Sequence, residues 1–352
     1  MKIKTRFNQI DKEGLYFIAD IGANHDGSLS KALELINLCK ESGAHAAKFQ
    51  NFSASKIVSK YEFDNIPKST HQANWHKSVF DVYKAASISS DWTPILKNEC
   101  DKVGIDYFTS PYDFDAVNAA DKYVDLYKIG SGDITWLEII EYILKKDKPI
   151  LLATGASDEL DVQRVMKLIQ SYNARHVLMQ CNTNYTGNNE NFKFINLNVI
   201  RRYAELYPDS ILGLSDHTPG HSTVLGAITL GGTVIEKHFT DNNKNIGPDH
   251  FFAMNPSSWR EMVDRSNELF LSLGDGVKRI ENNEKQSHDV QRRSICVSRD
   301  YKKGTILSKE DLVCLRPYSK DGFHPFEINK ILEKKLNVDL NKHQSLKRNY
   351  VV

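Results

Sequence analysis

Two histidines of this chain each follow a short apolar run. His217 comes after GLSD, and His238 closes IEKH, with Asp249 of GPDH a little further along the chain. Two imidazoles do not fill a coordination shell and no C-x-x-C pair accompanies them, so the pattern favours an open Mn²⁺ or Mg²⁺ site over structural zinc. The alternative for either histidine is a satisfied core residue. Glu236 shares the strand parity of His238, which predicts either a carboxylate that orients the imidazole or a buried partner for a lysine.

Two lysines and a glycine-rich turn have the features of an anion-binding site. Lys48 and Lys128 lie near the ends of two different apolar runs, and Lys128 continues into KIGSGD. Gly130 and Gly132 allow backbone amides to turn toward a ligand, and Ser131 adds a hydroxyl group. The same turn also occurs as a plain connection between a strand and a helix. With two lysines beside it, the pattern favours a phosphate or carboxylate ligand.

Eight short apolar runs alternate with amphipathic or turn-rich segments, and they must position these side chains. Strand, helix and strand in this repetition predict a (β/α)8 TIM barrel, with an open doubly wound sheet as the alternative. The predicted strands are residues 15–20, 45–50, 105–110, 124–129, 149–154, 176–181, 210–215 and 233–238.

A barrel places its active-site groups at the carboxyl ends of its strands. Polar side chains occur at or just beyond all eight predicted ends, although any one of them alone could be a solvated strand cap. They are Asp20, Lys48, Gln50, Thr109, Lys128, Thr154, Thr183, Tyr185, Ser215, His217 and His238. Their joint occurrence predicts a single site at one end of the barrel.

The composition is that of a globular protein whose net charge is close to zero. Lys and Arg number 46 against 45 Asp and Glu, so we expect neither a nucleic-acid partner nor a membrane partner. The first apolar cluster, LYFIA, is cut short by Asp20, which predicts neither a signal peptide nor a membrane span and indicates a cytoplasmic protein. The five cysteines are odd in number and are expected to be reduced, mostly packing residues.

Several long motifs in register resemble the sialic acid (nonulosonic acid) synthase family. They are IGANHDGSLSKALELINLCKESGAHAAKFQ, YKIGSGD, GLSDHT, IEKHFT, GPDH and SLGDGVK. Further on, RRSICVSRDYKKGTILSKEDLVCLRP at 292–317 resembles the antifreeze-like or SAF domain of that family. We therefore predict a TIM-barrel synthase domain over 1–280, a polar linker over 281–291 and a small β-rich SAF domain over 292–352.

The resemblance implies a transferase that condenses phosphoenolpyruvate with an N-acylated aminohexose and releases phosphate. It implies that a divalent metal on His217 and His238 polarises the sugar aldehyde. Asp20, Lys48, Lys128 and Asp249 would be catalytic. The phosphoenolpyruvate would be held by Lys48, Thr109, Lys128, Ser131, Thr183 and Ser215, and Gln50, Tyr185 and Asp249 would line the sugar. Asp133 would also be a substrate-binding residue. The resemblance further implies a domain-swapped homodimer in which Arg316 contacts the sugar in trans; the alternative is a surface arginine in a loop.

The sequence departs from the family pattern on the sugar side. Asp20 stands where the family usually has Glu, whereas Asp133 falls within its usual choice of Glu or Asp. In QCNTNYT, Gln180 replaces a usual His and Thr186 a usual Pro. The sugar is therefore left open between N-acetylmannosamine and a 2,4-diacetamido-trideoxyhexose. Two other functions are considered: condensation onto an aldose phosphate, which needs a further basic cluster, and a catalytically silent carbohydrate-binding protein.

Overall fold

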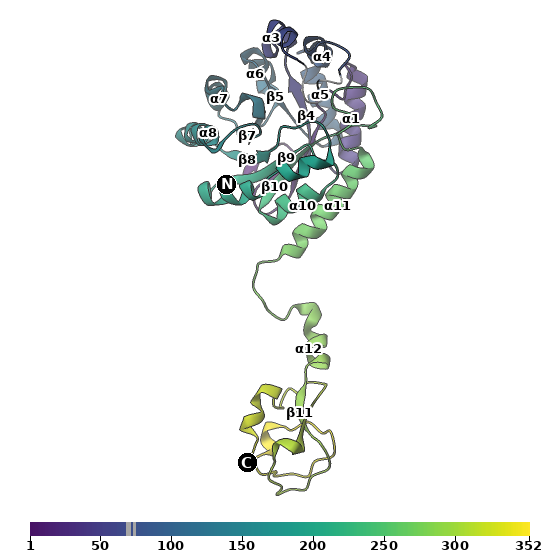
Figure 1. Ribbon diagram of the computed structural model, residues 1–352, viewed down its shortest axis with the longest axis vertical. Helices are drawn as coiled ribbons and strands as arrows, with labels where there is room; N and C mark the ends of the chain where they lie inside the picture. The colour runs from purple at the N-terminus through teal and green to yellow at the C-terminus, as the bar shows by residue number, and fades with distance from the viewer. Residues whose placement is uncertain (68–71, 73–74) are drawn as a thin grey trace. The chain divides into compact units, whose positions relative to one another are not determined.

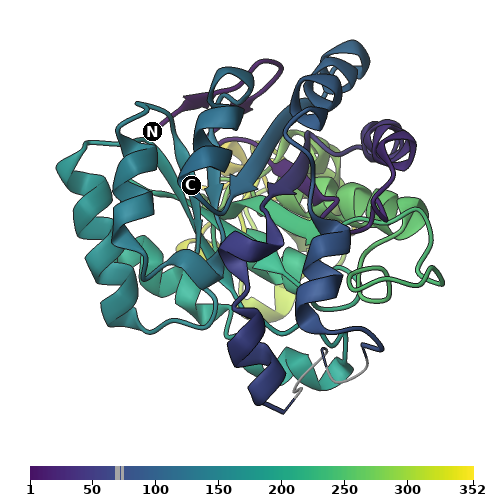
Figure 2. The same cartoon turned by 90° about the horizontal axis from the view of Figure 1, so that it is seen from above.

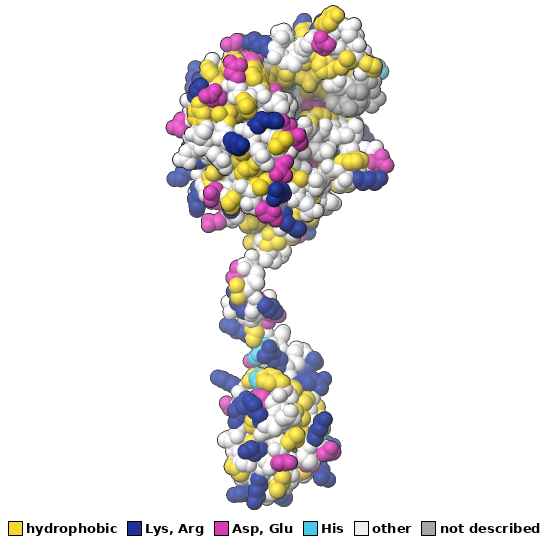
Figure 3. Space-filling view, turned by 60° about the vertical axis from the view of Figure 1, so that its left-hand side comes forward, with side chains coloured by type: hydrophobic (Ala, Val, Ile, Leu, Met, Phe, Trp, Pro, Cys, Tyr) yellow, Lys and Arg dark blue, Asp and Glu magenta, His cyan; other side chains and the backbone are white. Residues whose placement is uncertain are grey.

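The computed structural model describes residues 1–67, 72 and 75–352 of the chain. They form two compact units, Met1–Gly274 and Asp275–Val352 (Figure 1). On the face of the first unit that Figure 3 shows, acidic and basic side chains are intermixed. This face therefore presents no large surface of a single charge.

The first unit is built on eight parallel strands, as the sequence predicts. They are β3 (Tyr16–Asp20), β4 (Ala46–Asn51), β5 (Asp106–Pro111), β6 (Tyr127–Ile129), β7 (Ile150–Ala153), β8 (His176–Cys181), β9 (Ile211–Asp216) and β10 (Gly232–His238). Ladders join them in the order β5-β4-β3-β10-β9-β8-β7-β6, and β5 and β6 lie side by side. The (β/α)8 barrel is thereby confirmed. Nearly every strand residue is buried, which explains the continuous apolar runs.

Helices surround the strands on the outside of the barrel (Figure 2). They are α1 (Leu29–Glu41), α5 (Trp92–Val103), α6 (Phe114–Ala120), α7 (Leu137–Leu144), α8 (Glu159–Ser171), α9 (Asn198–Leu206), α10 (Ser222–Thr229) and α11 (Pro256–Leu273). Their ends follow ordinary capping chemistry. Ser28 caps α1 by accepting from the backbone N–H of Lys31, and Gly104 ends α5 in the left-handed region.

One connection of the barrel is longer than the rest. Between β4 and α5 the chain forms three short helices, α2 (Ala54–Ile57), α3 (Lys60–Asn65) and α4 (Val79–Ala86). These three helices are not among the elements predicted from the sequence. At the opposite end of the strands, the hairpin of β1 (Ile3–Lys4) and β2 (Gln9–Ile10) buries two isoleucines in the barrel core.

The second unit has its own core. It contains α12 (Lys285–Gln291), which lies within the predicted linker, and the antiparallel pair β11 (Ser294–Val297) and β12 (Leu312–Leu315). Its buried side chains include Ile295, Val297, Leu307, Ile331, Leu336 and Leu346. Among the residues that the structure describes, no helix is long and apolar enough to cross a membrane.

Candidate active site

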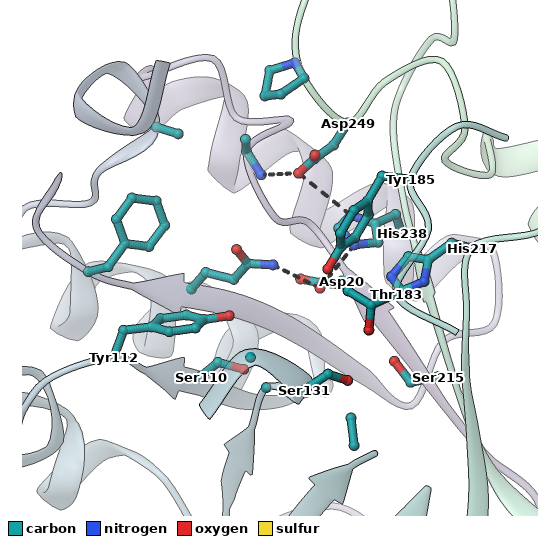
Figure 4. A pocket seen from close by; sticks show the side chains of 18 of the residues that line it. Asp20, Ser110, Tyr112, Ser131, Thr183, Tyr185, Ser215, His217, His238 and Asp249 are labelled. Carbon is teal, nitrogen blue, oxygen red and sulfur yellow. Dashed lines mark hydrogen bonds and ion pairs between the residues drawn. The ribbon is translucent and has the colours of Figure 1, made fainter. Parts of the chain in front are cut away.

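A cavity of about 440 Å³ opens at the carboxyl ends of the barrel strands. The residues that the sequence predicts at the site line this cavity, with the exceptions of Thr109, Thr154 and Arg316 (Figure 4). Thr154 instead donates to the carbonyl oxygen of Met179 at 3.0 Å. Strand register brings the lining residues together, because Asp20 on β3 pairs with Lys48 on β4 and with His238 on β10. Three polar groups from distant parts of the chain therefore share one level of the barrel.

The floor of the cavity consists of two buried ion pairs. Lys48 Nζ lies 2.7 Å from Asp20 Oδ2, and Lys128 Nζ lies 2.6 Å from Glu236 Oε1. The two pairs also contact each other, since Lys48 Nζ is 3.6 Å from Glu236 Oε1. Ser215 donates to the same Glu236 oxygen at 3.2 Å. Of the two roles left open for Glu236, the structure shows that of buried partner to the lysines.

These pairs keep the floor ionised. Burial alone would raise the pKa of Asp20, but Lys48, His238 and Lys128 together outweigh it and hold that pKa well below its usual range. Burial likewise opposes ionisation of Glu236, and Lys128 followed by Lys48 lowers its pKa overall. The pKa of Lys48 is raised, because Asp20 and Glu236 together outweigh the cost of burial. An anionic ligand must therefore share the lysines with carboxylates that already neutralise them.

His217 and His238 face each other across 5.5 Å between ring centroids. His217 Nδ1 is 2.9 Å from the carbonyl oxygen of Asn182, to which the ring can donate. Burial lowers the pKa of His217, but its contacts with Cys181, Asn182 and Asp216 together raise that pKa overall. His238 Nε2 is 3.5 Å from Asp20 Oδ2, and its Nδ1 is 3.6 Å from Asp249 Oδ2. That Nδ1 is buried and makes no hydrogen bond among the described residues. Burial lowers the pKa of His238, which favours the neutral imidazole that a metal needs.

This pair fits a divalent cation held mainly by non-protein ligands. The described part of the chain contains no cluster of three or more His, Cys, Asp or Glu side chains arranged to hold a metal. An ion on the two imidazoles would need further ligands, such as water or substrate. The orphaned Nδ1 of His238 is the observation that favours such a ligand.

Hydroxyl groups and a close backbone approach form the next part of the cavity. Ser131 Oγ accepts from the backbone N–H of Gly155 at 2.9 Å. Gly155 also approaches Thr183 so closely that a Cβ there would lie 1.9 Å from Thr183 Oγ1. The sequence analysis did not single out this glycine. The turn of KIGSGD ends in Asp133, whose pKa burial raises to about 6.

The loop that carries Asp249 is fastened to the loop after β3. Asp249 Oδ2 accepts from the backbone N–H of Ala23 at 3.0 Å. The adjacent His250 is buried, with Nδ1 2.7 Å from Thr240 Oγ1 and Nε2 3.0 Å from Asp26 Oδ1. These contacts fix Asp249 beside His238 before any ligand binds.

Thr109 does not line the cavity, and its neighbour Ser110 does. On β5, Ser110 pairs with Gln50 and Thr109 with Phe49, so the two side chains point to opposite faces of the barrel wall. Thr109 instead donates to Asn51 Oδ1 at 2.7 Å.

Arg316 lies in the second unit. It is exposed there, and its Nε donates to the backbone carbonyl of Gln291 at 2.7 Å. Cys181, expected to be a packing residue, lines the cavity. Burial raises the pKa of its thiol, but contact with His217 outweighs this and lowers the pKa overall.

Comparison with known proteins gives consistent matches over both units. Residues 35–278 match the model of the NeuB family, and residues 292–351 match that of the SAF domain. The N,N'-diacetyllegionaminic acid synthase of Legionella pneumophila is 32% identical over 93% of this chain and 91% of its own length. The pseudaminic acid synthase of Helicobacter pylori is 30% identical over 90% of this chain and 92% of its own. The N-acetylneuraminic acid synthetase structure from Leptospira borgpetersenii superposes with a TM-score of 0.72 at 23% identity, covering 82% of this chain and 95% of that one.

Proposed function

Because this chain belongs to the NeuB family, we propose that it is a nonulosonic (sialic-type) acid synthase. It would condense phosphoenolpyruvate with an N-acylated aminohexose, either N-acetylmannosamine or a 2,4-diacetamido-trideoxyhexose, and release phosphate. The observation that carries this proposal is a single cavity that joins two buried lysines to two facing imidazoles.

Lys48 and Lys128 would bind the phosphate and carboxylate of phosphoenolpyruvate through charge-assisted hydrogen bonds. Ser131, Thr183 and Ser215 place hydroxyl groups around the same cavity. Gly130 and Gly132 lie beside them, where backbone amides can meet an anion.

The charges of the cavity support a metal ion as a second component. Asp20, Glu236, Asp133 and Asp249 line it together with only two lysines, and no arginine lines it among the described residues. A multiply charged anion entering this pocket needs further positive charge. We propose that His217 and His238 hold Mn²⁺ or Mg²⁺, which when bound would act as a Lewis acid toward the sugar aldehyde.

In the proposed reaction, the enol carbon of phosphoenolpyruvate attacks the aldehyde and the new carbon–carbon bond forms. Water adds to the central carbon of the former phosphoenolpyruvate, and the tetrahedral intermediate loses inorganic phosphate as its carbon–oxygen bond breaks. The lysines hold the anion over the floor throughout. With a pKa of about 6, Asp133 is suited to accept a proton from the attacking water near neutral pH.

We further propose that the active enzyme is a domain-swapped homodimer. Arg316 of the partner subunit would then supply the arginine that the described cavity residues lack. Mixing Arg316→Ala protein with His238→Ala protein should restore activity, because one site of each mixed dimer has both residues intact. No recovery despite demonstrated subunit exchange would remove Arg316 from this role.

Release of phosphate from phosphoenolpyruvate with a panel of N-acylated hexosamines tests the function directly. Release should require both substrates and a divalent ion. A panel member carrying a sugar phosphate tests the aldose-phosphate alternative, for which the cavity offers no additional basic cluster among the described residues. Sugar binding by a folded protein without phosphate release would support the silent carbohydrate-binding protein and contradict the synthase.

A further inference from the structure

The cavity has a second, chemically different side, formed by the long connection between β4 and α5. We call this side the apolar wall and define it as Phe52, Ile57, Val82, Tyr83 and Ala86, all of which line the cavity. None of these side chains carries a charge. Among the described residues of the connection, Gln72 adds the one amide to the lining, and no lysine or arginine does.

Packing within the protein shapes this wall. Phe52 is 9% exposed, and its ring lies 5.5 Å from that of Tyr83 and 5.9 Å from that of Tyr112 between centroids. Val82 and Ala86 are four residues apart on α4, so they present one face of that helix. Helix α2, which carries Ile57, packs against α4. The wall is therefore assembled without a ligand.

The position of the wall relates it to the far end of the sugar, if the proposed function holds. Figure 4 shows His217, His238 and Tyr185 on one side of the cavity and Tyr112 across from them. The proposed chemistry places the sugar aldehyde at the histidines and phosphoenolpyruvate on the lysine floor. We infer that the remaining carbons of the sugar extend across the cavity toward Tyr112 and toward Phe52 of the wall, whose ring adjoins that of Tyr112.

We propose that the apolar wall selects an aminohexose whose far end is itself apolar. Such a sugar carries a methyl group in place of the terminal hydroxymethyl group and a second acylamino group at C4. The wall would desolvate the free hydroxyl groups of N-acetylmannosamine while offering them few partners, which disfavours that sugar. For the second acylamino group, it offers methyl contacts together with the Tyr83 hydroxyl and the Gln72 amide. Among the residues of the connection that the structure describes, none would offer a terminal phosphate a basic side chain in the cavity lining.

This inference rests on the proposed function, and one experiment separates the two. Phosphate release is measured with phosphoenolpyruvate, Mn²⁺ and one of three sugars: a 2,4-diacetamido-trideoxyhexose, N-acetylmannosamine, or the terminal phosphate ester of N-acetylmannosamine. We expect kcat/KM for the first sugar to exceed that for either other by at least about tenfold, since each apolar group in a matched pocket contributes about that much discrimination. Equal or better use of either N-acetylmannosamine compound overturns the inference and leaves the synthase proposal standing. No release with any sugar refutes both.

A variant locates the selectivity in the wall. Val82→Thr keeps the side-chain shape and exchanges a methyl group for a hydroxyl group. It should lower kcat/KM for the diacetamido sugar by about three- to tenfold while leaving both the value for N-acetylmannosamine and the KM for phosphoenolpyruvate unchanged. The matched control is Val277→Thr, at a side chain outside the cavity that is 60% exposed, and it should change none of these values. An equal loss with both sugars in Val82→Thr would contradict selection by the wall.

Discussion

Two buried lysines allow the binding of phosphoenolpyruvate to be separated from the stability of the barrel. Lys128 lies 2.6 Å from Glu236 and faces the cavity. Lys237 lies 2.5 Å from Asp216, also donates to the carbonyl oxygen of Thr218 at 2.6 Å, and does not line the cavity. The two side chains have the same exposed fraction of 2%. They are therefore matched in burial and pairing and differ in the face of the barrel they occupy.

Replacing either lysine by Met should destabilise the fold. Each change leaves a carboxylate buried without its partner, which typically lowers the free energy of unfolding by about 3–5 kcal/mol. For Lys128→Met we expect the lower end of that range, because Lys48 remains 3.6 Å from Glu236. Asp216 retains Thr223 and Thr218 as hydrogen-bond donors in Lys237→Met, which also limits the loss. Denaturant unfolding of both variants measures these losses.

Only Lys128→Met should weaken phosphoenolpyruvate binding. A charge-assisted contact to an anion contributes about 1.5–3 kcal/mol, so the KM for phosphoenolpyruvate should rise roughly tenfold to a hundredfold. Lys237→Met should keep the parent KM in assays run well below its unfolding temperature. A similar rise in both variants would attribute the effect to loss of structure, and an unchanged KM in Lys128→Met would remove this lysine from the anion site.

Four further outcomes are expected. Chelation should abolish phosphate release, and added Mn²⁺ or Mg²⁺ should restore it. The double variant His217→Ala/His238→Ala should bind the metal weakly. Full activity in excess chelator would exclude a role for the metal. Burial raises the pKa of Asp133 to about 6, so kcat/KM should fall as pH drops through that value, and Asp133→Asn should lack this acid limb. The pKa of Asp133 is higher in the folded than in the unfolded protein, so the free energy of unfolding decreases as pH rises through about 6 and this side chain ionises. Asp133→Asn cannot ionise there, and thermal unfolding at pH 7 should therefore show it to be more stable than the parent. Gly155→Ala should impair activity or folding, because its Cβ would lie 1.9 Å from Thr183 Oγ1, while Gly14→Ala, outside the cavity and with no atom within 4 Å of its Cβ, is the tolerated control in circular dichroism and kinetic assays.

The sequence predicts the barrel because both faces of its strands are buried. Continuous apolar runs mark such strands, and polar side chains at their carboxyl ends interrupt the pattern. The prediction is less precise within a strand, as Thr109 shows. Adjacent residues of a strand point to opposite faces. Whether Thr109 or Ser110 faces the cavity therefore depends on the register of β5 with β4, which the sequence around these two residues does not reveal.

Other parts of the site depend on distances that no local pattern encodes. Lys128 and Glu236 are 108 positions apart in the sequence, and only barrel closure brings them within 2.6 Å. The apolar wall comes from the long connection, where Phe52 lies 5.5 Å from Tyr83 of α4 between ring centroids and α2 packs against α4, so contacts between separate segments bring these residues to the cavity. The close approach of Gly155 to Thr183 likewise follows from packing at the strand ends.

Asp20 connects these parts of the site. Its Oδ2 accepts from Lys48 at 2.7 Å and from Gln50 at 3.0 Å, and it lies 3.5 Å from His238 Nε2. The β3–β4 and β3–β10 registers fix its backbone at the level of Lys48 and His238, so the length of the side chain decides how far the carboxylate reaches into the cavity. The Glu that the family usually carries here is one methylene longer and would extend about 1.5 Å further. Since the backbone is held on both sides, Asp leaves that space to the ligand, and a bulkier, doubly acylated sugar is the substrate that would use it.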